Sequence, residues 1–212
     1  MKPLRLGVYG LLAATTFVTF AVYAQQNTPG IPGLPAMPEK ATIDKPIKDF
    51  KLKDVMHDSK KKESEDAANI ALSQFKGKKN VVLFFMSERC GTTWKYEKRV
   101  GDMLKKYAKK DVEIMGVRCS ANDTSESIRK FAESKNFIMP VLNDEKGKLS
   151  SFFKITNTPT FAVIDKKGVL RYRGSFDDSP EESDVKKHYL SDAVVAVLDS
   201  KSVPVANTRP FG

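Results

Sequence analysis

The pattern of apolar and polar residues from residue 80 onward predicts strands that alternate with helices. Residues 81–86 are a short, continuous apolar run, which is typical of a strand buried on both faces. Residues 91–110 carry an apolar side chain at every third or fourth position, which predicts one helix with a core-facing stripe. Residues 112–117 predict the next strand. This alternation indicates parallel pairing through a crossover helix.

The second half of the chain has a different pattern. Residues 161–165 and 169–173 are strand-like runs separated by Lys166-Lys167-Gly168, which predicts an antiparallel hairpin. Residues 189–198 predict a final helix with one apolar face. We therefore expect the α/β class, with a central mixed sheet flanked by helices.

Three local features refine this expectation. Residues 49–55 alternate, which predicts an edge strand or hairpin arm in an N-terminal extension. Asp123 and Glu126 have the spacing of a capping box for a helix that follows the second strand. The acidic residues between 177 and 182 are expected to cap the final helix, where negative charge is favourable.

The N-terminus predicts export. Lys2 and Arg5 precede a nearly uncharged apolar run over residues 6–23, and Val22-Tyr23-Ala24 supplies the small residues of a cleavage site. We interpret residues 1–24 as a secretory signal peptide, which implies a periplasmic or extracellular protein; the alternative is a retained membrane anchor. Residues 25–45 form a Pro/Gly-rich linker, 46–200 the folded domain and 201–212 a tail.

The formal net charge of +10 raises the question of nucleic-acid binding. The lysines are spread over several short clusters, as on solvated helix faces, and no stacking platform or recognition motif accompanies them. We expect no nucleic-acid partner and no membrane span after signal cleavage. His57 and His188 lack ligand spacing, so neither a metal nor another cofactor is predicted.

Cys90 is the main candidate for chemistry. It follows the first buried strand and begins the next helix, and the positive field of a helix N-terminus favours thiolate over thiol. Cys119, the second of only two cysteines, follows the next strand. Two cysteines are too few for a disulfide scaffold, so a packed core must hold the fold.

The order of these motifs resembles the thioredoxin superfamily. A cysteine at a helix start, Thr158-Pro159-Thr160 before a strand, a glycine-containing hairpin and a last helix carry the resemblance. Residues 49–52 and 72–78 are further similar to the redoxin branch, which is related to alkyl hydroperoxide reductase and thiol-specific antioxidant proteins. The resemblance covers about residues 45–200 and implies a thioredoxin-like fold.

The resemblance also implies site geometry. Pro159 should be cis and face Cys90, helping a substrate backbone or partner thiol to dock; the alternative is a trans proline that begins a strand. Thr93 stands where dithiol thioredoxins have their second cysteine, so a local disulfide is excluded. Ser87 and Thr158 stand where peroxiredoxins have a threonine and an arginine. Ser87 could replace the hydroxyl donor, and the cation would have to come from Arg89 or Arg118.

These observations predict a thiol oxidoreductase, either peroxiredoxin-like or a monothiol thioredoxin-like enzyme. Cys90 would attack a disulfide of a partner protein or a small peroxide, and Cys119 or an external thiol would resolve the product. The alternative for Cys119 is a small buried hydrophobe. The alternative function is a non-catalytic module that binds an extended peptide at the Pro159 edge. The expected supporting residues are Ser87, Arg89, Thr93, Trp94, Thr158 and Pro159.

Overall fold

The computed structural model describes residues 40–57 and 68–212. The predicted signal peptide, most of the predicted linker and the charged segment 58–67 lie outside the described residues. Within the described part, no helix is both long enough and apolar enough to cross a membrane.

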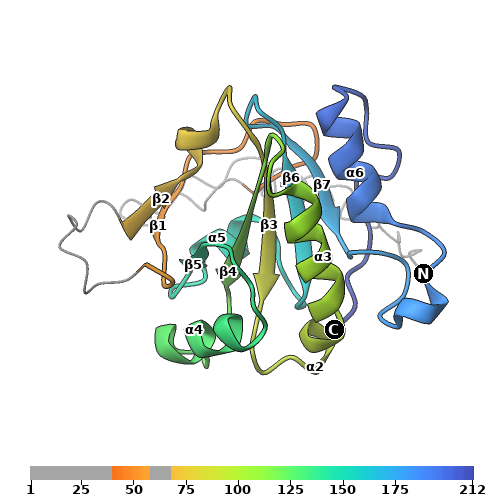
Figure 1. Ribbon diagram of the computed structural model, residues 1–212. Helices are drawn as coiled ribbons and strands as arrows, with labels where there is room; N and C mark the ends of the chain where they lie inside the picture. The colour runs from red at the N-terminus through yellow and green to blue at the C-terminus, as the bar shows by residue number, and fades with distance from the viewer. Residues whose placement is uncertain (1–39, 58–67) are drawn as a thin grey trace, which may run out of the picture. The chain divides into compact units, whose positions relative to one another are not determined.

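A five-stranded mixed sheet forms the centre of the domain, in the order β5-β4-β3-β6-β7 (Figure 1). The central strand β3 pairs in parallel with β4 and antiparallel with β6. β4 and β5 are parallel, whereas β6 and β7 form the predicted antiparallel hairpin. All residues of β3 are buried, as its unbroken apolar run predicts. The strands are β3 (Asn80–Met86), β4 (Val112–Arg118), β5 (Val141–Asn143), β6 (Thr160–Ile164) and β7 (Leu170–Gly174).

Helices cover both faces of this sheet. α3 (Glu97–Tyr107), α4 (Ser125–Ser134) and α6 (Tyr189–Leu198) pack their apolar stripes into one core cluster with alternate residues of β3. α5 (Lys148–Phe152) contributes to a second cluster, which contains the other residues of β3. α3 and α6 stand in front of the sheet in Figure 1, and α5 lies behind it. The expected α/β class and thioredoxin-like arrangement are confirmed.

An N-terminal segment covers the β5 edge of the sheet. The predicted N-terminal hairpin is present as β1 (Lys51–Lys53) and β2 (Asn69–Ala71), followed by the 3-10 turn η2 (Leu72–Phe75). It continues to the β5 edge, where the Val55 amide donates to the Val141 carbonyl at 2.8 Å. Covered edges leave fewer unpaired backbone groups for aggregation.

The helix predicted over residues 91–110 is two helices, so this prediction was wrong in one respect. α2 (Gly91–Lys95) ends at Lys95, Tyr96 stands between the two helices, and α3 runs from Glu97 to Tyr107. The Tyr96 side chain is buried, its hydroxyl donates to the Ser179 carbonyl at 3.3 Å, and the Arg99 guanidinium lies 4.0 Å from its ring centroid. These tertiary contacts fix Tyr96 and favour a break that periodicity alone does not reveal.

The capping box predicted for α4 is corrected. Thr124 is the N-cap of α4 and exchanges hydrogen bonds with Ser127, whereas Asp123 is buried and accepts from the Glu88 amide at 3.3 Å. Thr124 therefore caps α4 in place of Asp123, because the Asp123 carboxylate binds the amide of the neighbouring loop at Glu88.

The acidic segment before α6 does not cap that helix. Its N-cap is His188, which makes no side-chain capping bond. Asp177 instead pairs with Arg99 at 2.5 Å, and Glu182, at the start of the 3-10 turn η3 (Glu182–Asp184), pairs with Lys98 at 2.6 Å. These carboxylates therefore pair with Arg99 and Lys98 of α3 and do not cap α6.

Candidate active site around Cys90

Cys90 lies where β3 passes into α2, as the sequence predicts. It is the N-cap residue of α2 with extended backbone angles, φ −87° and ψ 110°, and the Thr93 amide donates to its carbonyl at 2.9 Å. Its thiol is partly exposed and donates to the Thr158 carbonyl at 2.8 Å. A strand-to-helix junction thus presents the sulfur at the surface beside the Thr158 peptide.

The Thr158–Pro159 peptide bond is cis, which confirms the conformation predicted for Pro159. It directly precedes β6, the antiparallel neighbour of β3. Because Cys90 follows the end of β3 and Thr158 precedes the start of β6, the antiparallel register brings the two residues together. Two segments that are far apart in the sequence therefore form one site.

The surroundings of Cys90 favour its thiolate. Burial is the largest effect and opposes ionisation. Hydrogen bonds from the side chains of Thr158 and Thr93 and from the backbone of Thr93 and Thr92 outweigh it, so the pKa of Cys90 lies below its ordinary value. The carbonyl of Thr158 accepts from the protonated thiol and so works against this shift. On balance the sulfur is more nucleophilic near neutral pH than a free thiol.

Thr93 is, after Thr158, the second side chain that stabilises the Cys90 thiolate. Its side chain is buried, and its hydroxyl has no hydrogen-bond partner among the described residues. The same hydroxyl lowers the pKa of Cys90. Thr93 thus occupies the position of a second thiol and offers a hydrogen-bond donor there.

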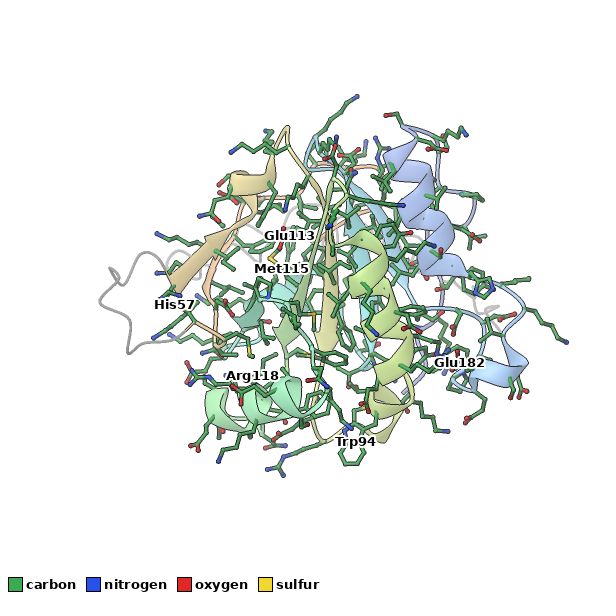
Figure 2. The ribbon with its side chains drawn as sticks, in the orientation of Figure 1. His57, Trp94, Glu113, Met115, Arg118 and Glu182 are labelled. Atoms are coloured by element: carbon green, nitrogen blue, oxygen red, sulfur yellow. The ribbon has the colours of Figure 1, made fainter. Side chains whose placement is uncertain are left out.

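The other predicted supporting residues organise the loop before α2. The Ser87 hydroxyl accepts from the Arg89 amide at 3.2 Å, and the Trp94 indole donates to the Glu88 carbonyl at 2.7 Å. Trp94, a residue of α2, is 55% exposed, and its side chain stands at the surface (Figure 2). None of these recorded bonds ends on the sulfur of Cys90, so these residues shape the loop that carries it.

The two arginines proposed as substitute cations, Arg89 and Arg118, bind groups other than the Cys90 sulfur. The Arg89 side chain is mostly exposed and lies 3.8 Å from the Asp123 carboxylate. Arg118 donates to the Asn143 side chain at 2.8 Å and to the Asp123 carbonyl. Both arginines brace the loops around Asp123, and hydroxyl and amide donors are what stabilise the thiolate of Cys90.

Cys119 lies in a different environment. It packs against the second core cluster, and its thiol donates to the Met86 carbonyl at 3.3 Å. Burial, followed by the negative charges of Asp123 and Asp144, raises its pKa to about 12. Both cysteines are free thiols. Cys119 therefore has the packing of a small hydrophobe, and its role as a resolving thiol stays a prediction.

The structure also reveals site residues that sequence reasoning did not single out. Asp123 holds the Glu88 amide, and Asn157 places its side chain beside the Thr158 peptide, where its amide donates to the Gly212 carbonyl. Asp123 was expected only to cap the following helix, Asn157 belongs to no motif, and both bonds join segments distant in sequence. Within residues 40–57 and 68–212, no group of three or more His, Cys, Asp or Glu side chains is arranged to hold a metal ion.

Comparison with known proteins identifies a family that this chain matches. The AhpC/TSA family model matches residues 43–173, which is more than half of the chain. The structure of a hypothetical protein from Sinorhizobium meliloti 1021 is similar with a TM-score of 0.69 and 23% identity, covering 82% of this chain and 93% of that one. This likeness shows a shared fold.

Two curated relatives match the region around the site. Chloroplastic peroxiredoxin Q from Triticum aestivum is 28% identical over 126 residues, which are 56% of this chain and 56% of that protein. Thiol-disulfide oxidoreductase ResA from Bacillus thuringiensis is 29% identical over 103 residues, which are 49% of this chain and 58% of that protein. The chain thus spans just over half the length of these relatives.

Proposed function

The chain belongs to the AhpC/TSA family of redoxin-type thiol proteins, and on that basis we propose that it is an exported oxidoreductase with Cys90 as its single nucleophile. The observation that carries this proposal is the position of the sulfur: partly exposed, at a helix N-terminus, beside the cis Pro159 peptide, with its pKa lowered. These are the conditions under which a protein thiol reacts.

Two reactions fit this thiol. With a disulfide, the Cys90 thiolate attacks one sulfur, a mixed disulfide forms, and the other sulfur leaves as a thiolate. With a peroxide, the thiolate attacks one oxygen, the O–O bond breaks, and Cys90 becomes a sulfenic acid while hydroxide or alkoxide leaves. A second thiol then condenses with the sulfenic acid, releasing water and forming a disulfide.

We assign the resolving step to an external thiol in preference to Cys119. A resolving thiol must lose its proton to attack the oxidised sulfur, and the raised pKa of Cys119, which is partly buried against the second core cluster, opposes this. The partner would then be a thiol protein or a small thiol, in keeping with the family.

We further propose that residues 1–24 direct export and that the linker predicted over residues 25–45 tethers the domain, although its last residues already pack on the domain: Ala41 is buried in the second core cluster and its amide donates to the Phe152 carbonyl at 2.8 Å. The charged start, the apolar run and the small residues before Gln25 support this assignment. An oxidising compartment would let a disulfide formed at Cys90 persist until a partner reduces it. N-terminal sequencing of the protein recovered from its native host tests this: an N-terminus at Gln25 supports export, and a retained Met1 contradicts it.

The decisive experiment maps the oxidation products of Cys90. The protein is challenged with hydrogen peroxide or a small disulfide, trapped by alkylation and analysed by mass spectrometry, beside Cys90→Ser and Cys119→Ala. We expect sulfenic acid or a mixed disulfide on Cys90, lost in Cys90→Ser and retained in Cys119→Ala. A Cys90–Cys119 disulfide would reinstate Cys119 as the resolving thiol. An inert Cys90 would instead favour a binding module.

A further inference from the structure

The C-terminal segment lies along the outer edge of β7. The Arg173 amide donates to the Ala206 carbonyl at 3.0 Å, and the Thr208 amide donates to the Arg173 carbonyl at 3.1 Å. These bonds make a parallel bridge between Arg173 and Asn207. The segment is therefore seated on the sheet by backbone pairing.

Thr208 anchors the segment with its side chain. Its hydroxyl lies 2.7 Å from the Tyr172 hydroxyl and accepts from the Ser175 amide at 2.9 Å. Gly174 provides the space for it, because a Cβ at this position would overlap the Thr208 hydroxyl. The seat is thus shaped to take this side chain.

Beyond Thr208 the segment reaches the thiol site. The Asn157 side-chain amide donates to the Gly212 carbonyl. Gly212 packs so closely on the Thr158 carbonyl that a Cβ would overlap this oxygen. The Cys90 sulfur lies 2.8 Å from the same oxygen. One peptide carbonyl is therefore in contact with the nucleophile on one side and with the C-terminal segment on the other.

We propose that residues 206–212, which we name the strap, occupy the peptide edge formed by Asn157 and Thr158 and must leave it before the backbone of a protein substrate can bind there. The proposal rests on Cys90 acting as the nucleophile. The substrate class it concerns is a disulfide within an extended polypeptide, whose backbone would compete with Gly212 for this edge. A small oxidant needs only the sulfur, which is partly exposed with the strap in place.

The strap therefore makes Cys90 selective by substrate size. If the strap is open for only a fraction of the time, the rate with a polypeptide is reduced to that fraction of the rate of the open protein, whereas the rate with a small reagent is unchanged. Loosening the strap should raise the first rate and leave the second unaffected.

The test uses two probes on the intact protein. Iodoacetamide alkylates Cys90 and reports the intrinsic reactivity of the thiol. The second probe is a short synthetic peptide whose cysteine is held in a disulfide with thionitrobenzoate. Attack of the Cys90 thiolate on the peptide sulfur forms a mixed disulfide and releases thionitrobenzoate, which is measured by absorbance. Cys119→Ala serves as the background to remove the second thiol.

Gly212→Ala and Thr208→Val loosen the strap, because one adds a Cβ where none fits and the other removes the hydroxyl that bonds to the Tyr172 hydroxyl and the Ser175 amide. Val205→Ala is the matched control, since this side chain is 44% exposed and precedes the strap. We expect peptide exchange about fivefold faster in both loosened variants, with alkylation within about twofold of the parent. The control should match the parent with both probes.

A chain truncated after Val205 removes the strap altogether, with circular dichroism to verify that it is folded. If peptide exchange is equally fast in the parent, the loosened variants and the truncated chain while alkylation proceeds normally, the strap proposal is overturned and the function of Cys90 stands. If iodoacetamide finds Cys90 inert in every variant, the proposed function fails. Should the truncated chain unfold, the two point variants decide alone.

Discussion

At the scale of single residues, the site relies on short, uncharged donors. Burial opposes ionisation of Cys90, and the side chain of Thr158, the amide and hydroxyl of Thr93 and the amide of Thr92 together outweigh it. Thr93 contributes through both its backbone and its side chain, and only the side-chain part can be removed by substitution. The side chains of Thr158 and Thr93 are therefore the two groups through which the reactivity of Cys90 can be tuned.

Thr93→Val should make Cys90 less reactive near neutral pH. The substitution keeps the branched shape but removes the hydroxyl donor, and a hydrogen bond to a charged group is worth about 1.5–3 kcal/mol. We expect iodoacetamide alkylation of Cys90 at neutral pH to slow by about tenfold, because the pKa of Cys90 rises and less thiolate is present. The pH dependence of the alkylation rate, followed by mass spectrometry, measures the change.

Thr93→Ser is the control for this experiment, because it keeps the hydroxyl and loses a methyl group. It should alkylate at nearly the parental rate, with the midpoint of its pH profile still below that of a free thiol. Equal profiles for the valine and serine variants would show that the hydroxyl does not stabilise the thiolate and that the backbone amides suffice.

What the sequence reveals about the site depends on how local each interaction is. Cys90 and Pro159 stand out because their roles follow from neighbours in the chain, a strand before a helix and a Thr-Pro pair before a strand. Asn157 and Asp123 do not, because their partners lie 55 and 35 positions away. No spacing rule connects such pairs before the fold is known.

At the scale of elements, the junction of α2 and α3 is held by a buried ion pair. Arg99 donates to the Asp177 carboxylate at 2.5 Å, to the Ser179 and Pro180 carbonyls at 3.1 and 2.5 Å, and to the Lys95 carbonyl at 3.3 Å. The last bond ends on the final residue of α2. One side chain therefore ties the end of α2, the start of α3 and the loop before α6 together.

Arg99→Met should destabilise the protein strongly. It leaves the buried Asp177 carboxylate without its cation, and breaking one side of a buried pair costs about 3–5 kcal/mol of unfolding free energy. Adding Asp177→Asn should recover part of this loss, because the orphaned charge is removed. Urea denaturation of both single variants and the double variant measures the coupling.

The exposed Lys98–Glu182 pair on the same helix is the matched control. Its side chains are 69% and 54% exposed, and such pairs are worth at most about 1 kcal/mol. Lys98→Met should therefore change the unfolding free energy little. Similar losses for Arg99→Met and Lys98→Met, or no recovery in the double variant, would contradict the role given to Arg99.

Elements could be predicted where one pattern governs a whole segment. The predicted bounds of α6 are the observed ones, and those of β3 and β4 agree to within one residue, because burial imposes an unbroken apolar run or a single stripe. The break at Tyr96 and the cap at Thr124 escaped prediction. Both depend on side chains recruited by another segment, Arg99 with Ser179 in one case and Asp123 with Glu88 in the other.

At the scale of the whole molecule, the two cysteines respond to pH in opposite directions. Cys90 has a lowered pKa and Cys119 a pKa raised to about 12. A thiol with a lowered pKa stabilises the folded state above its unfolded value, and this gain is lost as the pH falls through the folded pKa. A thiol with a raised pKa stabilises the folded state below its unfolded value, and this gain is lost as the pH rises.

Cys119 should therefore make global stability fall in mildly alkaline solution. Above about pH 8.5 the unfolded chain releases the Cys119 proton while the folded protein retains it, so the unfolding free energy falls by up to about 1.4 kcal/mol per pH unit from this residue. Cys119→Ala removes this slope but not the titration of the lysines, so the difference between the two proteins isolates it. Urea denaturation from pH 8 to about 10 under reducing conditions measures both. If the unfolding free energies of the parent and Cys119→Ala changed equally with pH over this range, Cys119 would ionise as easily in the folded protein as in the unfolded chain. The raised pKa of Cys119 would then no longer argue against its role as a resolving thiol.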